Sequence, residues 1–358
     1  MSRILLLTDD MGPGGAERQL AFLAIELKKA GHRIRLVGFH GKENHYAESL
    51  AANDIELETH TEGRSRLTRP WVIRRLIREH KAEAVIAYKD GPSMAACLAR
   101  LIPGRRFRLI VSERNLTQKE MPLYEKIKFQ LFRLADYVVP NSYTQQEYIK
   151  SHLPHLATKT TAITNMVDTE LFSPLNDNSP TPSQTPAVMA VGRVGRQKNT
   201  LNYLKAIREL KDRGVQCKFV WYGWMEEEFI PLVKESVEQL SIGDMITFHP
   251  ATTDVVTEYR KADIFCLPSI YEGFPNVLCE AMACALPCVC SDVCDNPHII
   301  GRQEWTFNPR SVNDMADVLQ KMISLPAEER HKIGVRNRER VTEICSAETF
   351  VRKYEALF

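Results

Sequence analysis

Two glutamates lie eight positions apart in the stretch YEGFPNVLCEAMACA, and their carboxylates are the first candidates for ligand chemistry. Glu272 precedes a Gly-Phe-Pro-Asn turn, whereas Glu280 lies more than one turn inside the apolar run that follows, which is expected to form a short helix. Gly273 permits a tight turn, and Pro275 suits the first position of that helix. The two glutamates therefore cannot be an i,i+4 helical pair, and we expect them to contact two different parts of one elongated ligand.

A second candidate loop, VGRVGRQKN (residues 191–199), follows a strand-like run. Arg193 and Lys198 lie five positions apart across a glycine-bearing turn, where both can converge on one diphosphate, the arginine as a fork and the lysine as a point charge. Their alternative is an ordinary role as solvated surface residues. The GxxxxGKS/T phosphate loop is absent, so a Walker-type ATPase is not indicated.

A third candidate loop, DDMGPGGAERQL (residues 9–20), lies between the first strand-like run and the first helical pattern. Gly14 and Gly15 let the backbone approach a ligand closely, and the helix N-terminus that follows offers N–H groups to an anion. A dinucleotide-binding G-x-G-x-x-G pattern starting at Gly12 would need glycine where this chain has Glu17, so a dehydrogenase is disfavoured. The alternative is that these glycines serve only a turn.

The elements that must position these loops form two similar series. Short apolar strands alternate with helical patterns, which predicts parallel sheets covered by helices on both faces. Residues 171–187 are dense in Pro, Ser, Asn and Asp, and they predict a linker between two Rossmann-like domains that face one another across a cleft. We predict one domain over 1–170, with a helix in 341–358 that crosses back to it, and a second domain over 188–340. The runs expected as strands are RILLLT, IRLVGF, AEAVIAY, FRLIVS, DYVVPNS and TAITN, then VMAVGR, CKFVWYG, MITFHP, DIFCLPS and LPCVCSD.

Composition agrees with two ordinary globular domains. The chain has 358 residues, of which 44% are hydrophobic and 26% charged. The N-terminal MSRILLLTDD is too short for a signal-peptide core, and no apolar run approaches the ~18 residues of a membrane span, so a cytoplasmic location is expected. Nine cysteines include no paired C-x2-C spacing and are predicted to be small buried hydrophobic residues instead of metal ligands.

The three loops together suit a nucleotide sugar. One carboxylate would bind the sugar hydroxyls, the N-terminus of the helix that contains Glu280 would face the diphosphate, and the second carboxylate would bind the ribose. YEGFPNVLCEAMACALP closely resembles the E-x7-E signature of the retaining family 4 glycosyltransferases, which have the GT-B fold. GGAER and GRVGRQKN are similar to the donor-site loops of that family. Further similar segments are PNSYTQQEYI, ITNMVDTELFSP and SDVCDNPHIIG, so the resemblance covers most of the chain, in order.

The resemblance implies transfer of a hexosyl or N-acetylhexosaminyl group from a nucleoside diphosphate sugar, expected to be a UDP-sugar, to a glycan hydroxyl with retention of anomeric configuration. The acceptor is expected to be lipid-linked and to bind the N-terminal domain. The implied catalytic residues are Glu272 on the sugar hydroxyls and Arg193 and Lys198 on the departing diphosphate. No metal and no cofactor is expected, since these cations and the helix N-terminus stabilise the leaving group and the nucleotide sugar is a substrate. The implied donor-binding residues are Gly14, Gly15, Gly273, Phe274, Pro275, Asn276 and Glu280.

The chain departs from the family pattern in two places. Many members carry a histidine near the reacting sugar, after the strand corresponding to FRLIVS, where this chain reads SERN. The residues Glu113, Arg114 and Asn115 of that loop, together with Glu17, are candidates for contacts with the acceptor or the sugar. Where members often have Phe-x-Gly before the nucleotide-base loop, this chain has Phe248-His249-Pro250, so contacts with the base are not assigned.

A basic segment marks the N-terminal half. From Arg64 to Lys81 the chain has seven basic residues and one acidic residue, with Trp71 and several aliphatic residues between them. A basic amphipathic helix with an aromatic residue fits a surface that meets anionic lipid headgroups, which predicts peripheral association with the cytoplasmic face of the inner membrane. The alternative is a solvated, arginine-rich helix face. No nucleic acid partner is expected, because the net charge is only +2 and no binding motif occurs.

Two other functions remain open at this point. A sugar-nucleotide epimerase can share the two-domain architecture, but it needs no acceptor. A nucleotide-sugar-binding subunit without catalysis is disfavoured because Arg193, Lys198, Glu272 and Glu280 are all present.

Overall fold

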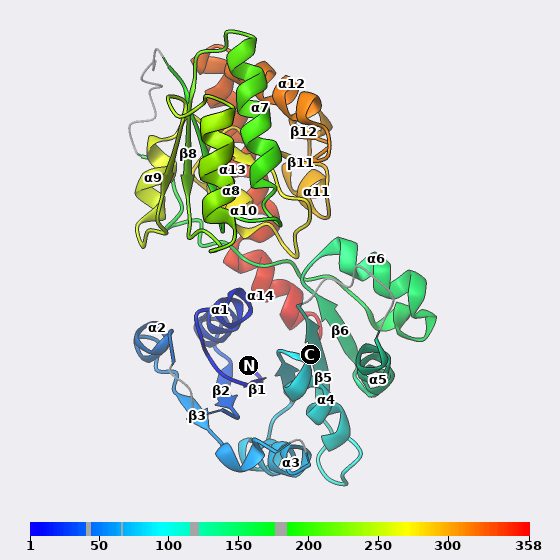
Figure 1. Ribbon diagram of the computed structural model, residues 1–358. Coiled ribbons are helices and arrows are strands. Elements are labelled where there is room, and N and C mark those ends of the chain that lie inside the picture. The colour runs from blue at the N-terminus through cyan, green and yellow to red at the C-terminus, as the bar shows by residue number, and fades with distance from the viewer. Residues whose placement is uncertain (41–43, 66, 115–121, 176–184) are drawn as a thin grey trace. The chain divides into compact units, whose positions relative to one another are not determined.

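The computed structural model describes residues 1–40, 44–65, 67–114, 122–175 and 185–358. The chain divides into two compact units. Unit 1 consists of Met1–Met166 and Ala347–Phe358, and unit 2 of Val167–Ser346 (Figure 1). These bounds differ by a few residues from the predicted domain limits. Much of the predicted linker, namely 176–184, lies outside the described residues.

Unit 1 contains a six-stranded sheet of parallel strands in the order β3-β2-β1-β4-β5-β6. The chain builds outward from β1 to β3, then returns to the other side of β1 with β4, so the strand order reverses between β1 and β4. The strands are β1 (Arg3–Thr8), β2 (Arg33–Gly38), β3 (Leu57–Thr59), β4 (Ala84–Ala87), β5 (Arg108–Glu113) and β6 (Tyr137–Pro140). The helices are α1 (Gly15–Lys29), α2 (Ala47–Ala51), α3 (Arg69–His80), α4 (Asp90–Ala99), α5 (Leu123–Leu131), α6 (Tyr143–His152) and α14 (Ala347–Glu355), with 3-10 turns at Thr61–Gly63, Phe132–Leu134 and Pro154–Lys159.

Helices cover both faces of the unit 1 sheet, as its continuous apolar strands require. Side chains of α3, α4 and α5 pack on one face and those of α1 and α14 on the other. From α14, Phe350 and Tyr354 are buried against α1 and the sheet, and the Tyr354 hydroxyl lies 2.9 Å from that of Tyr88. The prediction that the C-terminal helix packs on the N-terminal domain is therefore confirmed.

Unit 2 repeats this topology with strand order β12-β11-β10-β7-β8-β9, again all parallel. Here the order reverses between β7 and β10. The strands are β7 (Ala187–Val191), β8 (Lys218–Tyr222), β9 (Ile246–His249), β10 (Ile264–Leu267), β11 (Cys288–Ser291) and β12 (Thr306–Phe307). The helices are α7 (Thr200–Asp212), α8 (Phe229–Gln239), α9 (Val255–Lys261), α10 (Asn276–Ala283), α11 (Asn296–Ile300), α12 (Val312–Ile323) and α13 (Ala327–Cys345), with a 3-10 turn at Gln303–Trp305.

The sequence interpretation was wrong at a few element boundaries. The run TAITN (161–165) is not a strand. Thr160 makes an isolated bridge to Val138, and Thr161 and Ile163 donate to carbonyls of β6, but these bonds do not extend into a ladder. The short edge strands β3 and β12 were not predicted. Pro275 precedes α10 as its N-cap residue and does not occupy the first helical position.

Two further observations concern expectations from composition. Eight of the nine cysteines are buried and Cys294 is half-buried, which confirms their prediction as small packing residues. Within the described ranges, no helix combines the length and apolar character needed to cross a membrane.

Candidate functional site

The centre of the candidate site in unit 2 is an ion pair between Lys198 and Glu272. The Lys198 Nζ lies 2.6 Å from Glu272 Oε1, and both side chains are largely buried. Lys198 belongs to the loop after β7 and Glu272 to the loop after β10, so the pair spans the point where the strand order reverses. Ligands of open α/β sheets bind in the crevice at such a point. The Ser269 hydroxyl donates a hydrogen bond of 2.5 Å to the same carboxylate oxygen.

Gly192 allows the lysine to fold back toward the glutamate. Its φ is +135°, and a Cβ atom there would lie 2.7 Å from Lys198 Cε. Any other residue would therefore be strained by its backbone and would displace the lysine stem. The Gly192 carbonyl is fixed by a 2.8 Å hydrogen bond from Trp221 Nε1. Gly192 is therefore required for the position of Lys198, and not only for a turn.

Arg193 lies in the same loop but is more exposed than Lys198. Its Nε is 3.1 Å from Glu226 Oε1, and its guanidinium lies 5.5 Å from the ring centroid of Trp224. Arg193 also donates to Gln197 Oε1 at 3.1 Å. Gln197 in turn donates from its side chain to the Tyr271 carbonyl at 3.2 Å, which links the loops after β7 and β10. The structure thus brings both predicted phosphate-binding cations to the loop edge that carries Glu272.

Glu280 is held on the inner side of α10. It is buried, and Tyr259 Oη donates to its Oε2 at 3.3 Å and to the Val277 carbonyl at the same distance. Burial raises the pKa of the Tyr259 phenol, and the nearby Glu280 carboxylate raises it further, so the hydroxyl remains a donor. Glu280 is therefore held by Tyr259, whereas Glu272 is held by Lys198 and Ser269. Their contact with two different parts of one ligand stays a prediction.

In the turn between the glutamates, the backbone is open at Gly273 and the chain is anchored by Phe274. A Cβ atom on Gly273 would meet no atom within 4 Å, whereas Phe274 is buried in the core of unit 2. The α10 helix begins at Asn276, after Pro275, without a side-chain cap. An uncapped helix N-terminus favours a bound anion, because its first N–H groups and the helix dipole both face it.

Three side chains that support this site were not assigned roles from the sequence. Ser269, Gln197 and Tyr259 fix the glutamates and the two loops through the hydrogen bonds above. Ser269 could have been suspected from its position at the end of a predicted strand. Tyr259 could not, because its link to Glu280 depends on the packing of α9 against α10.

In unit 1, Gly14 and Glu17 form the start of α1. Gly14 is the N-cap residue, and a Cβ atom there would clash with the Glu17 carboxylate, which folds back over the helix start. Gly15 is the first residue of the helix. Glu17 is buried and pairs with Lys89, whose Nζ also lies 3.0 Å from Asp10 Oδ1. Glu17 is thus a buried partner of a lysine from the loop after β4.

In the SERN loop, Glu113 is buried and Arg114 lines a cavity. Glu113 ends β5, is completely buried, and pairs with the equally buried Lys128 at 2.7 Å. Direct contact between Glu113 and a ligand would require this pair to open. Arg114 donates to Asn165 Oδ1 at 2.7 Å, lies 4.2 Å from the ring centroid of Tyr88, and lines a cavity of about 490 Å³. Asn115 lies outside the described residues.

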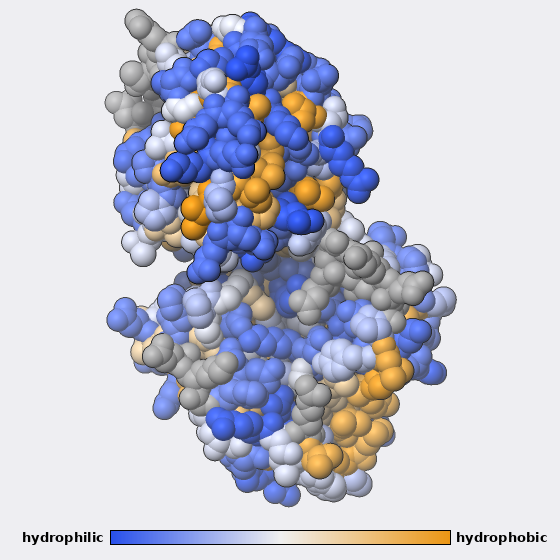
Figure 2. All heavy atoms as spheres, viewed as in Figure 1, coloured by the Kyte–Doolittle hydropathy of each residue, from blue (hydrophilic) through white to orange (hydrophobic). Residues whose placement is uncertain are grey.

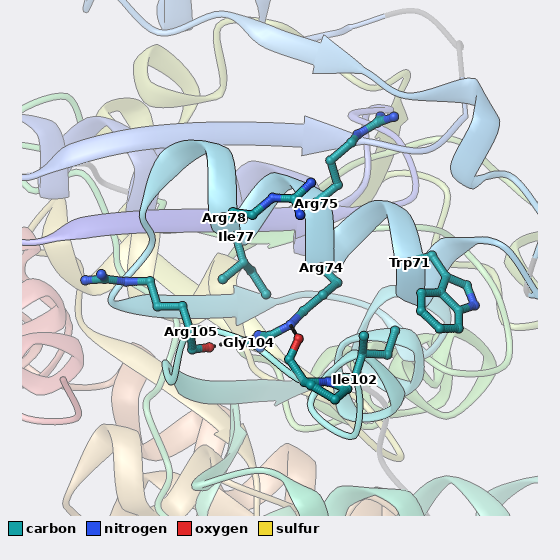
Figure 3. Close-up of a pocket in the computed structure, with 9 residues that line it drawn as sticks. Trp71, Arg74, Arg75, Ile77, Arg78, Ile102, Gly104 and Arg105 are labelled. Carbon is teal, nitrogen blue, oxygen red and sulfur yellow. Dashed lines mark hydrogen bonds between the residues drawn. The ribbon is translucent and has the colours of Figure 1, made fainter.

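The basic segment forms α3 and a smaller pocket beside it. Figure 3 shows Arg74 pointing to the backbone of the loop around Gly104, where it donates to the carbonyls of Pro103 at 3.2 Å and Arg105 at 2.8 Å. Trp71, which is 65% exposed, forms one side of this pocket of about 310 Å³. Arg74 is therefore engaged with backbone, whereas the indole is available on the surface.

A metal centre is not seen in the part of the chain that the structure describes: His, Cys, Asp and Glu form no group of three or more placed to hold an ion.

The chain matches two family models that meet near the boundary of the units. Residues 13–171 match the model described as Glycosyltransferase Family 4, and residues 174–340 match Glycosyl transferases group 1. An alpha-1,4-N-acetyl-D-galactosaminyltransferase of Campylobacter jejuni is 26% identical over 79% of this chain and 77% of its own length. A second C. jejuni enzyme, a diphospho-undecaprenol-linked 4-alpha-N-acetylgalactosaminyltransferase, is 23% identical over 82% of this chain and 81% of its own.

Solved structures support the same fold. A glycosyltransferase from Rickettsia africae aligns with a TM-score of 0.81 at 18% identity over 99% of this chain and 97% of its own. The Anabaena protein HepE in complex with UDP aligns with a TM-score of 0.82 at 18% identity over 99% of this chain and 98% of its own. With both family models matched in order and two Rossmann-like units in place, the chain belongs to the family 4 glycosyltransferases of the GT-B fold.

Proposed function

We propose that this glycosyltransferase transfers a hexosyl or N-acetylhexosaminyl group from a UDP-sugar to a hydroxyl of a lipid-linked glycan, with retention of anomeric configuration. The observation that carries the proposal is the Lys198–Glu272 pair at the strand-order reversal of unit 2. In the structure the two charges compensate each other. A bound donor would divide them, because a phosphate accepts from the ammonium while a sugar hydroxyl donates to the carboxylate.

The remaining groups fit the other parts of such a donor. Arg193 can add a second, forked contact to the diphosphate, and the N-terminus of α10 presents a partial positive charge. Glu280 would accept from the ribose hydroxyls, held in place by Tyr259. Since stabilisation of the departing diphosphate is a main part of catalysis here, we expect these groups to perform it without a metal or a cofactor. Transfer that survives a chelator such as EDTA would support this part of the proposal.

Similar proteins support the proposed donor and acceptor classes. HepE has been solved with UDP and with UDP-glucose. The names of the two C. jejuni relatives specify N-acetylgalactosaminyl transfer and undecaprenol-linked glycans. These names support a UDP-sugar donor and a lipid-linked acceptor for this chain, with the acceptor on unit 1.

A lipid-linked acceptor places the enzyme at a membrane, and we propose that unit 1 binds the anionic cytoplasmic face of the inner membrane. Figure 2 shows hydrophobic side chains gathered on the part of unit 1 that carries α4 and α5. Leu101 is 64% exposed and Leu123 73%, and the exposed Trp71 lines a pocket together with arginines of α3. Exposed apolar and aromatic residues next to arginines suit the interface of an anionic bilayer.

Incubation with UDP-sugars tests the proposed reaction. Purified protein should be stabilised by at least one UDP-sugar, by about 2.7 kcal/mol when the ligand is 100-fold above its Kd. With a lipid-linked glycan present it should release UDP, and NMR of the product should show the donor's anomeric configuration. A changed sugar in the absence of any acceptor would instead identify an epimerase. Binding without release across acceptors would identify a non-catalytic subunit.

A further inference from the structure

Lys89 has an unusual backbone conformation for a residue with a side chain. Its φ is 66° and its ψ is 159°. This region of φ and ψ is occupied almost only by glycine, because a Cβ atom is crowded there. Such strain persists only where the surrounding structure holds it, and it occurs most often at functional sites. Lys89 lies between β4 and α4, at the carboxyl end of its strand.

The side chain of Lys89 crosses the strand-order reversal of unit 1. It extends from the end of β4 to the end of β1, where it pairs with Asp10 at 3.0 Å and with Glu17 at the start of α1. The ammonium is thus the link between the loops after β1 and β4. The predicted crevice for a ligand of this sheet lies between the same two loops.

A cavity of about 490 Å³ lies beside this link. Its charged lining consists of the basic Arg64, Arg69, Lys89 and Arg114 and the acidic Asp9 and Asp90, with His40 beside them. Within it, Arg69 pairs with Asp9 at 2.8 Å. The volume falls within the range of small-molecule sites, about 300–1,000 Å³. Carboxylates accept, an ammonium or guanidinium donates, and a histidine can do either, so a lining that contains these groups together suits hydroxyls, which do both at once.

We propose that Lys89 is a positioning residue for the acceptor, which binds this cavity as a hydroxyl-rich sugar ring. The positive φ of Lys89 turns its side chain back across the sheet edge, where its ammonium pairs with the Asp10 and Glu17 carboxylates. The acceptor hydroxyl that receives the new bond would be presented from this cavity. This inference rests on the proposed glycosyltransferase function, because a sugar acceptor is needed only if sugar is transferred.

Substitutions of Lys89 separate the effect of its ion pairs from the effect of its strained backbone. Lys89→Ala removes the ion pairs and keeps the strained backbone, whereas Lys89→Gly removes both. Lys89→Gly should therefore show a higher melting temperature than Lys89→Ala. Lys81→Gly is the matched control: Lys81 is also left-handed, with φ 54° and ψ 40°, but it ends α3 at the opposite end of β4. Both glycine variants relieve a left-handed lysine, and only Lys89→Gly should lose acceptor binding.

Methyl glycosides of N-acetylgalactosamine, N-acetylglucosamine and galactose are the probes of acceptor binding, detected on the full chain by saturation-transfer NMR. We expect at least one signal with the wild type and Lys81→Gly, its loss in Lys89→Ala and Lys89→Gly, and partial recovery in Lys89→Arg. In transfer assays, Lys89→Ala should raise the KM for the lipid-linked acceptor while the KM for the UDP-sugar stays unchanged. Undiminished glycoside binding by Lys89→Ala, or no binding by the wild type, would overturn the inference.

The slow hydrolysis of a UDP-sugar without acceptor distinguishes failure of this inference from failure of the proposed function. Hydrolysis that persists in Lys89→Ala and Lys89→Gly, with wild-type acceptor kinetics, contradicts only the role of Lys89. If the wild type neither binds nor hydrolyses any UDP-sugar, the proposed function itself is wrong.

Discussion

At the carboxyl edge of each sheet, a lysine pairs with a carboxylate across the strand-order reversal, but the two partners follow opposite strands in the two units. In unit 2 a lysine after the first strand, Lys198, pairs with a glutamate after the fourth, Glu272. In unit 1 the lysine, Lys89, follows the fourth strand, and its acidic partners follow the first. The left-handed position also differs, since unit 2 has glycine at 192 and unit 1 has the lysine itself.

The difference indicates that each edge is built for a different ligand. The unit 2 lysine shares its loop with a second cation, Arg193, and its partner Glu272 shortly precedes the uncapped N-terminus of α10, a combination that favours phosphate. The unit 1 lysine is neutralised by two carboxylates and faces a cavity of mixed charge, which favours hydroxyls. Under the proposed function, one topology would carry a site for each substrate of the transfer reaction.

The largest expected effect is on the donor edge. Lys198→Ala and Glu272→Ala should each lower the transfer rate by about 100- to 1,000-fold, because each removes a charged contact with the donor. The two residues are in contact, so the double variant should lose far less than the product of the two effects. Circular dichroism should show an intact fold, and Lys205→Ala on the exposed side of α7 should retain activity. Full activity in either single variant would refute its assigned role.

Charge reversal on α3 should have the next largest effect, on membrane binding. Each basic residue near an anionic surface contributes about 1 kcal/mol, so Arg78→Glu should weaken binding to phosphatidylglycerol vesicles roughly fivefold or more. Co-sedimentation at several salt concentrations measures this effect. Lys234→Glu, an exposed reversal on α8 of unit 2, is the control. Equal losses in both variants would mean that net charge, and not this face of unit 1, determines binding.

A smaller effect is expected from the residue that supports Glu280. Tyr259→Phe removes the 3.3 Å hydrogen bond to the carboxylate and should weaken UDP-sugar binding by about three- to tenfold, the usual contribution of one hydrogen bond. Tyr203→Phe, at another fully buried tyrosine of unit 2, provides the comparison. Calorimetric titration measures both. If the two variants bind the donor equally well, Glu280 does not depend on Tyr259.

The smallest expected effect is a pH-dependent contribution to the free energy of unfolding from Glu58, in the outermost strand β3 of unit 1. The forked hydrogen bond from Arg35 holds the pKa of Glu58 below its ordinary value of 4.5. A lowered pKa stabilises the fold above the ordinary value, and that contribution is lost as the pH falls through the lowered pKa. At neutral pH, Glu58→Gln should cost about 0.2–1 kcal/mol, since the pair is partly exposed. Thermal unfolding at several pH values measures the difference in stability between Glu58→Gln and the wild type, which should vanish in acid. The control Glu227→Gln should show no such pH-dependent difference.

Sequence patterns located the loops at the carboxyl edge of unit 2 better than the ion pairs at the carboxyl edge of unit 1, and the reasons are physical. Glu272 and Lys198 lie in loops with glycine or proline, whose spacing alone indicates a turn beside a helix start. Lys89 follows a plain apolar strand, and nothing in its neighbours predicts a left-handed backbone. The burial of Glu113 depends on Lys128, which reaches it from the next helix along the chain.

The local sequence pattern was likewise sufficient to predict the long strands and insufficient to predict the short ones. Strands with continuous apolar runs, such as β1 and β5, were predicted within a residue or so. The edge strands β3 and β12 have too few residues to show a pattern. TAITN has a strand-like composition, but it makes too few bonds to β6 to form a strand, and Asn165 at its end accepts a hydrogen bond from Arg114.

Donor titration of variants from both edges tests the central claim, that the two units bind different substrates. UDP-glucose, UDP-N-acetylglucosamine and UDP-N-acetylgalactosamine are titrated calorimetrically into the wild type, Lys198→Ala and Lys89→Ala. We predict that the wild type binds at least one of them, that Lys198→Ala binds it much more weakly, and that Lys89→Ala binds it as the wild type does. Unchanged binding by Lys198→Ala, or an equal loss in Lys89→Ala, would contradict the division of substrates between the two sheets.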